Sequence, residues 1–179
     1  MTTPSDKSQE NSEYQIYLMR HGVAMSRGTN SSSEDAKRKL TPEGQEKMEK
    51  IAKGLLRLGV EFDWIVTSPL VRAVETGRIV GEAYGGKIPT DTCDALSPGK
   101  RAEDLLSYLA KQPERRRILL VGHEPDLGIL AGRFLGAGPN ANLTFKKGGC
   151  CLITCERLPV KSHGNLVWWL TPRVLRALA

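Results

Sequence analysis

Short apolar runs alternate along this chain with stretches whose apolar residues recur at helical spacing. The first run, Tyr14–Arg20, places apolar side chains on both faces of a strand, as in a sheet that is covered on each side. Arg117–Gly122 is the most apolar run and indicates a strand of the same kind. Strands that alternate with helices favour a parallel sheet between two helical layers. The predicted fold is therefore α/β, a three-layer α/β/α sandwich around a mostly parallel mixed sheet of about six strands.

The remaining elements are predicted from the residues at their ends. Thr41-Pro42 is expected to start a helix that Gly59 ends, and Ser68-Pro69 is expected to cap a helix that runs to about Tyr84. The polar segment Gly22–Lys39 predicts a long mobile loop. The other expected elements are strands at Asp63–Thr67, Lys87–Thr92, Cys150–Glu156 and Leu166–Leu170, and helices at Arg101–Lys111 and from Pro125 or Asp126 to Leu135. The last two strands form a predicted hairpin.

The length and composition favour a single domain. The chain has 179 residues, of which 40% are hydrophobic, and this suits one compact unit over residues 14–179 preceded by a polar, flexible tail at 1–13. An apolar stretch of the ~20 residues that cross a bilayer is absent, and the first residues lack the hydrophobic core of a secretory signal. We therefore expect a cytoplasmic protein with no membrane partner.

Charge and cysteine usage narrow the function further. A formal net charge of +6 favours an anionic partner, which could be nucleic acid, an anionic membrane face or a phosphorylated substrate. The few aromatic residues are not interleaved with basic runs, so a platform for stacking nucleic-acid bases is poorly supported. The four cysteines form no C-x-x-C pair, which predicts buried free thiols rather than a metal site.

Reactive or anion-binding residues follow three of the predicted strands. The first strand ends in Arg20 and is followed by His21, and His123 follows the strand that ends at Gly122. Arg72 lies one turn into the helix after the second strand. Because the carboxyl ends of parallel strands form the ligand-binding edge of such a sheet, we expect these four residues to meet. Taken singly, two of them have a structural alternative: His21 could be an ordinary half-buried histidine, and Arg72 could pair with Glu75 on a helix surface.

This set of side chains suits a phosphoryl group. Two guanidinium groups bind a tetrahedral dianion through paired N–H donors, and the start of the helix beside His123 adds backbone donors. A neutral imidazole is a competent nucleophile, and nearby guanidinium charges disfavour its protonation. Phosphoryl transfer asks a protein mainly for positioning and charge stabilisation. We therefore expect activity to fall on acidification as His21 gains a proton.

Three blocks of the sequence resemble the signatures of the histidine phosphatase (phosphoglycerate mutase-like) superfamily. They are Leu18–Gly22 (L-M-R-H-G), Thr67–Ala73 (T-S-P-L-V-R-A) and Val121–Pro125 (V-G-H-E-P). Leu40–Gly44 (L-T-P-E-G) and the short chain are similar to its small bacterial branch, the SixA-type phosphohistidine phosphatases. The resemblance implies a phosphoglycerate mutase-like fold and one histidine phosphatase catalytic domain over 14–179.

The resemblance also implies roles for individual residues. It makes His21 the nucleophile that is transiently phosphorylated, with Arg20 and Arg72 holding the phosphoryl oxygens. His123 would bind the same group and stabilise the five-coordinate transition state. All four would thus be both catalytic and phosphate-binding residues. The resemblance implies no metal and no cofactor, because the arginines supply the positive charge.

The proton donor is left open by the sequence. Larger relatives carry an acid on an insertion that this short chain lacks, or an Asp directly after the second His. This chain has Glu124 there and Asp126 two positions further on, and the substrate or water could serve instead. A leaving imidazole, with an ordinary pKa of about 6.5, needs less help from an acid than an alkoxide does, which favours a phosphohistidine substrate. Arg27 is either a lid residue that reaches the substrate or part of a disordered loop.

The sequence thus predicts a metal-independent phosphatase that hydrolyses protein phosphohistidine through phospho-His21. One alternative is a small-molecule or phosphoprotein (Ser/Thr/Tyr) phosphatase of the same fold, and another is a non-catalytic phosphate- or nucleic-acid-binding module. The expected partners are a phosphorylated protein or small phosphorylated substrate, with inorganic phosphate as product and no nucleic acid. We expect a monomer. Lys146-Lys147 is either a solvated pair of charges or part of a docking surface, and His163 is expected to be solvated.

Overall fold

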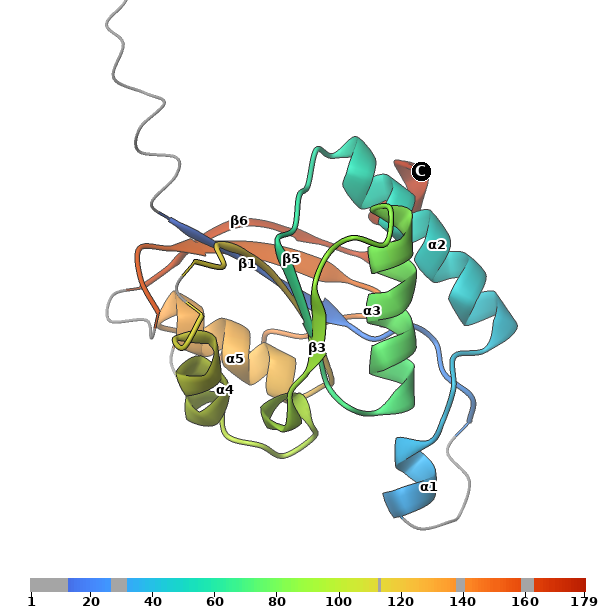
Figure 1. Ribbon diagram of the computed structural model, residues 1–179, viewed down its shortest axis with the longest axis horizontal. Helices are drawn as coiled ribbons and strands as arrows, with labels where there is room; N and C mark the ends of the chain where they lie inside the picture. Colours follow the sequence, from blue (N-terminus) through green and yellow to red (C-terminus); the bar gives the residue numbers. More distant parts are fainter. Residues whose placement is uncertain (1–12, 27–31, 113, 138–140, 159–162) are drawn as a thin grey trace, which may run out of the picture.

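The computed structural model describes residues 13–26, 32–112, 114–137, 141–158 and 163–179 (Figure 1). Apart from Glu13, the expected tail at 1–13 lies outside this part of the chain, as does Arg27. The strands of the described part are β1 (Tyr14–Arg20), β2 (Trp64–Thr67), β3 (Thr90–Thr92), β4 (Arg117–Gly122), β5 (Cys150–Cys155) and β6 (Asn165–Leu170).

These strands form one mixed sheet with the order β3-β2-β4-β1-β5-β6. The four strands from β3 to β1 run parallel to their neighbours, whereas β5 pairs antiparallel with both β1 and β6. The predictions of a mostly parallel sheet of six strands and of a C-terminal hairpin are confirmed. In this order β4 lies between β1 and β2, so the carboxyl ends of the three strands that carry the signature blocks are adjacent.

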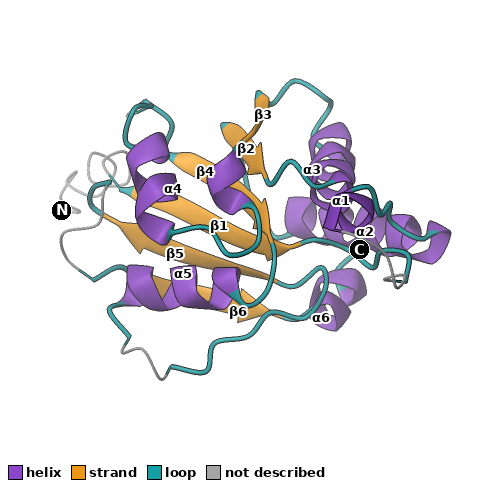
Figure 2. Cartoon of the chain, turned by 90° about the horizontal axis from the view of Figure 1, so that it is seen from below, coloured by secondary structure: helices purple, strands orange, loops and turns teal. Residues whose placement is uncertain are grey.

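Helices cover both faces of the sheet (Figure 2). The helices of the described residues are α1 (Ser32–Ala36), α2 (Pro42–Arg57), α3 (Val71–Ala83), α4 (Ala102–Leu109), α5 (Asp126–Leu135) and α6 (Pro172–Ala177), with a 3-10 turn η1 (Asp94–Leu96). Apolar residues of α4 and α5 pack in one core cluster, and those of α2, α3 and α6 pack in the other. The molecule is therefore the predicted α/β/α sandwich.

Burial on both faces of the sheet explains why the sequences of the central strands β1 and β4 are apolar throughout. In the register of β1 and β4, Ile16 pairs with Ile118 and Leu18 pairs with Leu120, and all four side chains lie fully buried in the core under α4 and α5. The intervening Tyr17 is buried in the core on the opposite face. Because full burial of a large aliphatic side chain contributes about 1.5–3 kcal/mol, this double-sided packing fixes the position of both strand ends.

Side-chain caps begin two of the helices in the same way. Thr41 Oγ1 accepts a hydrogen bond from the backbone N–H of Gly44 at 2.9 Å, as predicted for the start of α2. Thr171 Oγ1 accepts from the backbone N–H of Val174 at 3.4 Å at the start of α6. Helix α6 was not predicted, although this second Thr-Pro pair is the same local signal as the first.

The predicted start of α3 was wrong. Ser68-Pro69 does not cap this helix, which begins at Val71 after Leu70 and has no side-chain cap. The backbone N–H of Leu70 donates to Ser68 Oγ at 3.3 Å in the turn that leaves β2. The serine therefore shapes the exit from the strand rather than the first turn of the helix.

The prediction of one long loop over Gly22–Lys39 was also wrong. Helix α1 forms within it, and Ala24 makes an isolated antiparallel bridge with Leu40. No apolar periodicity marks α1 in the sequence, because polar contacts made by Asp35 and Arg38 hold this helix in place.

The four cysteines, which are Cys93, Cys150, Cys151 and Cys155, are all buried free thiols, as predicted. Within the described ranges no group of three His, Cys, Asp or Glu side chains is arranged to hold a metal ion. Over the same residues no helix has the length and apolar character needed to cross a bilayer.

Candidate active site

The three strand ends that were predicted to carry the site are adjacent in the sheet. Arg20 is paired with Gly122 in the register of β1 and β4, so His21 and His123 leave the sheet as neighbours, with ring centroids 5.1 Å apart. Arg72 reaches the same edge from the first turn of α3, which follows β2. The four predicted residues line one cavity of about 520 Å³. The structure thus brings all of them together.

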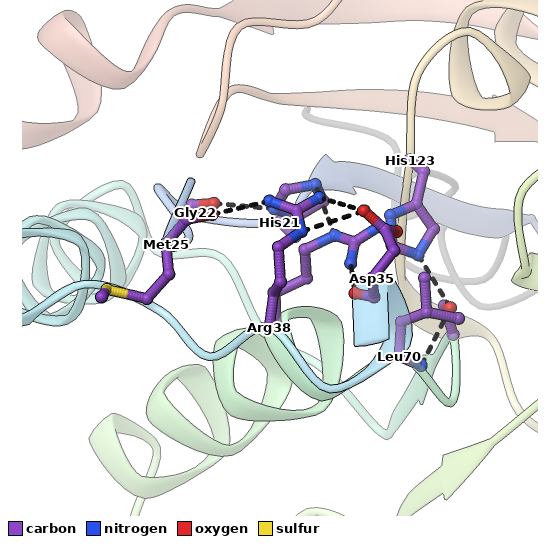
Figure 3. A network of polar contacts seen from close by, with 9 residues as sticks. His21, Gly22, Met25, Asp35, Arg38, Leu70 and His123 are labelled. Atoms are coloured by element: carbon purple, nitrogen blue, oxygen red, sulfur yellow. Dashed lines mark hydrogen bonds and ion pairs between the residues drawn. The ribbon is translucent and has the colours of Figure 1, made fainter. Parts of the chain in front are cut away.

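His21 is buried and is held in one tautomer by its two neighbours. Its Nδ1 lies 2.7 Å from the carbonyl oxygen of Gly22. A carbonyl can only accept, so we assign the ring proton to Nδ1. Arg72 Nε donates to Nε2 of His21 at 3.2 Å, which requires a lone pair on Nε2 (Figure 3). His21 therefore presents an unprotonated nitrogen next to a guanidinium group.

The environment of His21 keeps the ring neutral. Burial lowers its pKa to about 3 and is the largest cause. The neighbouring His123 and the charges of Arg72 and Arg20 lower the pKa further, while the hydrogen bond to Gly22 acts in the opposite direction. A neutral ring with an unprotonated nitrogen is the form that attacks phosphorus, and the attack requires Nε2 to give up its hydrogen bond from Arg72.

His123 is buried and is oriented by Ser68. Its Nε2 lies 2.8 Å from Ser68 Oγ, which also accepts the backbone N–H of Leu70 (Figure 3). Burial lowers the pKa of His123 to about 4; the positive charge of Arg72 adds to this, and the negative charge of Asp35 opposes it. The serine that was expected to cap a helix is instead the partner of the second histidine.

Arg20 is anchored through the backbone of Phe145. Its Nη1 donates to the carbonyl oxygen of Phe145 at 2.7 Å, and the N–H of the same residue donates to Glu124 Oε1 at 3.0 Å. Burial raises the pKa of Glu124, while the contacts with Phe145 and Arg20 lower it. Glu124 therefore lines the cavity and, through its hydrogen bond with Phe145, holds the backbone that binds Arg20.

Asp126, the other acid considered, lies elsewhere. Its Oδ2 accepts the backbone N–H of Gly99 at 3.0 Å, and it lines a second cavity of about 270 Å³ between α4 and α5. That cavity shares only His123 with the first. Asp126 is therefore a weaker candidate for the proton donor than Glu124.

Two buried nitrogens of the site lack a hydrogen-bond partner among the described residues. They are Nε of Arg20 and Nδ1 of His123, and both side chains line the larger cavity. A buried polar atom left unpaired costs about 1–3 kcal/mol. An anion with several oxygens, held in this cavity, would accept a hydrogen bond from Arg20 Nε, and from His123 Nδ1 when that nitrogen carries the ring proton.

The charges around the cavity favour an anion as well. Its charged lining residues are Arg20, Arg38, Arg72, Lys147, Asp35 and Glu124. Four positive and two negative side chains leave a net charge of +2 with both histidines neutral. The arrangement therefore suits a small dianion beside a nucleophilic ring nitrogen.

Sequence reasoning missed two residues of this site. Asp35 and Arg38 lie in the segment that was interpreted as a loop, and no local pattern marks them. The structure also excludes the alternative partner of Arg72: Glu75 Oε2 accepts the backbone N–H of Leu40 at 2.6 Å, whereas Arg72 forms an ion pair with Asp35 at 3.2 Å. His163 is exposed outside the cavity, as expected.

Known proteins share this sequence pattern. Residues 16–98 match the family model of the histidine phosphatase superfamily (branch 1). An uncharacterized protein of Picosynechococcus sp. (strain ATCC 27264 / PCC 7002 / PR-6) is 32% identical over 152 residues, which cover 83% of this chain and 90% of that protein. The chain belongs to the histidine phosphatase superfamily. Membership of this superfamily supports phosphatase activity.

Solved structures share the fold. The protein histidine phosphatase SixA, in complex with tungstate, matches with a TM-score of 0.76 at 24% identity, over 90% of this chain and 99% of that chain. A phosphoserine phosphatase from Entamoeba histolytica, in complex with 3-phosphoglyceric acid, matches with a TM-score of 0.66 at 18% identity, over 90% and 99%. At these identities the likeness establishes a phosphoglycerate mutase-like fold, which was the predicted one.

Proposed function

We propose that this member of the histidine phosphatase superfamily hydrolyses phosphohistidine in proteins through a covalent phospho-His21 intermediate. The observation that carries the proposal is the hydrogen bonding of the neutral His21 ring. Its Nδ1 donates to the carbonyl oxygen of Gly22, and its unprotonated Nε2 lies 3.2 Å from Arg72 Nε. Both residues line a positively charged cavity. Phosphorus bound in that cavity would lie beside the one ring nitrogen that can attack.

The first step transfers the phosphoryl group to the enzyme. Nε2 of His21 attacks phosphorus and forms a new N–P bond, while the N–P bond of the substrate breaks. The electron pair of that bond goes to the leaving ring nitrogen, which departs as neutral imidazole when the other ring nitrogen of the substrate carries a proton. The Nδ1 proton of His21 stays on the hydrogen bond to Gly22, which offsets the charge that develops on the ring.

Arg20, Arg72 and His123 stabilise the negative charge on the phosphoryl oxygens during this step. Each faces the cavity from a different strand end, so the donors are in place before the charge develops. In the second step water attacks phosphorus, the bond to Nε2 breaks with its electron pair returning to His21, and inorganic phosphate is released together with both protons of the water, as dihydrogen phosphate or, after loss of a proton to solvent, as hydrogen phosphate. The enzyme returns to its starting state with no net gain of protons.

The positions of the two candidate proton donors, Glu124 and Asp126, support phosphohistidine over phosphate esters as the substrate. Glu124 Oε1 is engaged with the backbone N–H of Phe145, and Asp126 lies at the other cavity. An alkoxide leaving group would need a strong proton donor, whereas an imidazole with an ordinary pKa of about 6.5 needs little help. The likeness to the fold of a protein histidine phosphatase supports the same substrate class.

Trapping of the intermediate tests the nucleophile. The protein is incubated with a phosphohistidine peptide labelled with ³²P and is then analysed on an alkaline gel and after acid treatment. Wild type should show an acid-labile, alkali-stable phosphoenzyme that His21→Ala abolishes. His163→Ala is the matched control, because His163 is exposed and outside the cavity, and it should label like wild type. Labelling that persists in His21→Ala would refute the assignment of the nucleophile.

A substrate panel tests the leaving group. The release of inorganic phosphate from a phosphohistidine peptide is compared with that from the corresponding phosphoserine and phosphotyrosine peptides, sugar phosphates and nucleotides. We expect the highest kcat/KM on phosphohistidine. Faster turnover of a sugar phosphate or of phosphoserine would assign the protein to the small-molecule or phosphoprotein phosphatases, and phosphate binding without any turnover would indicate a binding module.

A further inference from the structure

Asp35 of α1 joins two arginines at the edge of the cavity (Figure 3). Its backbone oxygen accepts from Arg72 Nη1 at 2.8 Å, and its Oδ2 pairs with Arg72 Nη2 at 3.2 Å. Its other carboxylate oxygen, Oδ1, lies 3.0 Å from Nε and 2.9 Å from Nη2 of Arg38. Arg38 Nη1 in turn donates to the carbonyl oxygen of Met25 at 2.8 Å. Both carboxylate oxygens of Asp35 are therefore held by cations.

The contacts of Arg72 lie on different edges of its guanidinium group. In a planar guanidinium, Nη1 and Nη2 form the end of the fork, whereas Nε and Nη2 form its side. Asp35 binds the end, through Nη1 and Nη2. Nε donates to Nε2 of His21, so the side of the fork is turned toward the nucleophile. A phosphoryl group attached to or leaving this nitrogen would meet that side edge.

A negative charge next to an anion-binding site weakens anion binding, and a second arginine offsets this effect here. Asp35 on its own would repel a phosphoryl dianion and would neutralise Arg72. Arg38, bound to the second oxygen of the carboxylate, restores the positive charge of the group: two guanidiniums share one carboxylate. Arg72 is only 5% exposed in its side chain, and Asp35 is 14% exposed, so these partners are largely shielded from solvent.

We propose that Asp35 is a positioning residue that orients Arg72 for the phosphoryl group. It does not touch the reacting atoms; it acts by holding the end of the guanidinium so that the Nε side faces His21 and a phosphoryl group bound next to it. The inference rests on the proposed function only in taking Arg72 as a phosphate ligand. If the carboxylate of Asp35 only competed with the bound anion, its removal would strengthen anion binding. A positioning role predicts that its removal weakens anion binding.

The binding of orthovanadate and of inorganic phosphate, measured by titration calorimetry, tests the inference. Asp35→Ala should weaken vanadate binding about 10-fold or more, which corresponds to the loss of one charge-assisted hydrogen bond. Phosphate binding should weaken less, because only five-coordinate vanadate requires the oriented fork. Asp35→Asn, which keeps an oxygen in the same place, should restore most of the affinity. Glu34→Gln is the matched control: it removes a neighbouring, exposed negative charge of α1 and should bind like wild type.

Two further variants separate position from charge. Asp35→Glu keeps the charge but displaces the oxygens by one methylene, so it should also weaken vanadate binding; it carries the test if Asp35→Ala does not fold. In an Arg72→Lys background, Asp35→Ala should cause no further loss, because a lysine has no fork to orient. Tighter or unchanged vanadate binding in Asp35→Ala or Asp35→Glu overturns the inference. Absence of vanadate binding to wild type would instead contradict the proposed function.

Discussion

His21 and His123 lie with their ring centroids 5.1 Å apart and their planes at 52°, and both rings are buried beside arginines. Burial is the largest cause of the lowered pKa of each ring, and the charges of Arg72 and Arg20 act in the same direction on both. Two neutral imidazoles can therefore share one positively charged cavity near pH 7, one with a lone pair for attack and the other as a hydrogen-bonding partner of the transferred group.

The pH dependence of turnover should reflect these values. Because the pKa of His21 is about 3 and that of His123 about 4 in the free protein, protonation of these rings should lower kcat/KM only below about pH 4. The sequence predicted a fall in activity on acidification as His21 gains a proton, and because burial lowers the pKa of His21 we now expect that fall at a lower pH than an ordinary histidine would give. Measurement of kcat/KM over pH 3.5–8, with an acid-stable aryl phosphate as the substrate, tests this. Half-loss near pH 6.5 would show that His21 is not held neutral by its site.

The same two rings should make the stability depend on pH. Both pKa values are lower in the folded chain than the ordinary value of about 6.5 in the unfolded chain. The unfolded state therefore binds more protons between these values, so the free energy of unfolding should decrease as the pH falls from about 6.5 toward 4. The slope should reach about 1.4 kcal/mol per pH unit for each histidine. Urea denaturation of wild type and His21→Gln over this pH range should differ by one such slope.

Ser68→Ala tests the orientation of His123. The variant removes the hydroxyl that lies 2.8 Å from Nε2 of His123 but changes no charge. We expect kcat to fall about 10-fold, which corresponds to one neutral hydrogen bond of about 1.4 kcal/mol, with little change in KM. Ser107→Ala, at an exposed position of α4, provides the control. A change below twofold in Ser68→Ala would assign the ring orientation to other contacts.

Glu124→Gln tests whether this carboxyl supplies a proton. Gln keeps the oxygen that accepts the N–H of Phe145, so the anchor of Arg20 should remain. On a phosphohistidine peptide kcat should change less than about threefold, because the leaving imidazole needs little help. Glu124→Ala removes the acceptor as well, and it should lower the free energy of unfolding by about 1–2 kcal/mol. A loss of 100-fold or more in Glu124→Gln would identify Glu124 as the general acid.

Gly44→Ala tests the close approach between α2 and the segment after His21. A Cβ at Gly44 would lie 2.1 Å from the carbonyl oxygen of Val23, so the chain next to the nucleophile must move. We expect a loss of at least about 2 kcal/mol in the free energy of unfolding and a lower kcat. Gly81→Ala is the matched control, since its Cβ would lie at ordinary contact distances from Ile65 (3.5 Å) and Thr90 (4.0 Å). It should be neutral or stabilising by up to about 1 kcal/mol, from helix propensity.

The sequence predicted those parts of the fold whose cause is local. The apolar run of β1 reflects burial on both faces, and Thr41-Pro42 marks the first turn of α2 through a contact three residues away. The convergence of Arg20, His21 and His123 also follows from local strand signals, once the strands are taken as parallel neighbours. The strand order then places these residues side by side at one edge of the sheet.

Contacts between distant polar segments were not predictable in this way. Asp35 is held by Arg72, which lies 37 residues later in the chain, and neither apolar spacing nor a cap motif records such a pair. Ser68 was predicted to cap the nearby helix. Its actual partner, His123, is 55 residues away in the chain, and the sequence contains no local sign of that contact. Long-range polar pairing of this kind leaves no periodic trace in a single sequence.

The link between Arg20 and the carbonyl oxygen of Phe145, 125 residues apart, has a consequence for biosynthesis. Translation delivers the proposed nucleophile, His21, well before the backbone that holds the adjacent guanidinium. A nascent polypeptide that ends between these two positions therefore carries His21 without the complete phosphate-binding site. Under the proposed mechanism, reactivity has to wait until Phe145 has been made and has reached Arg20.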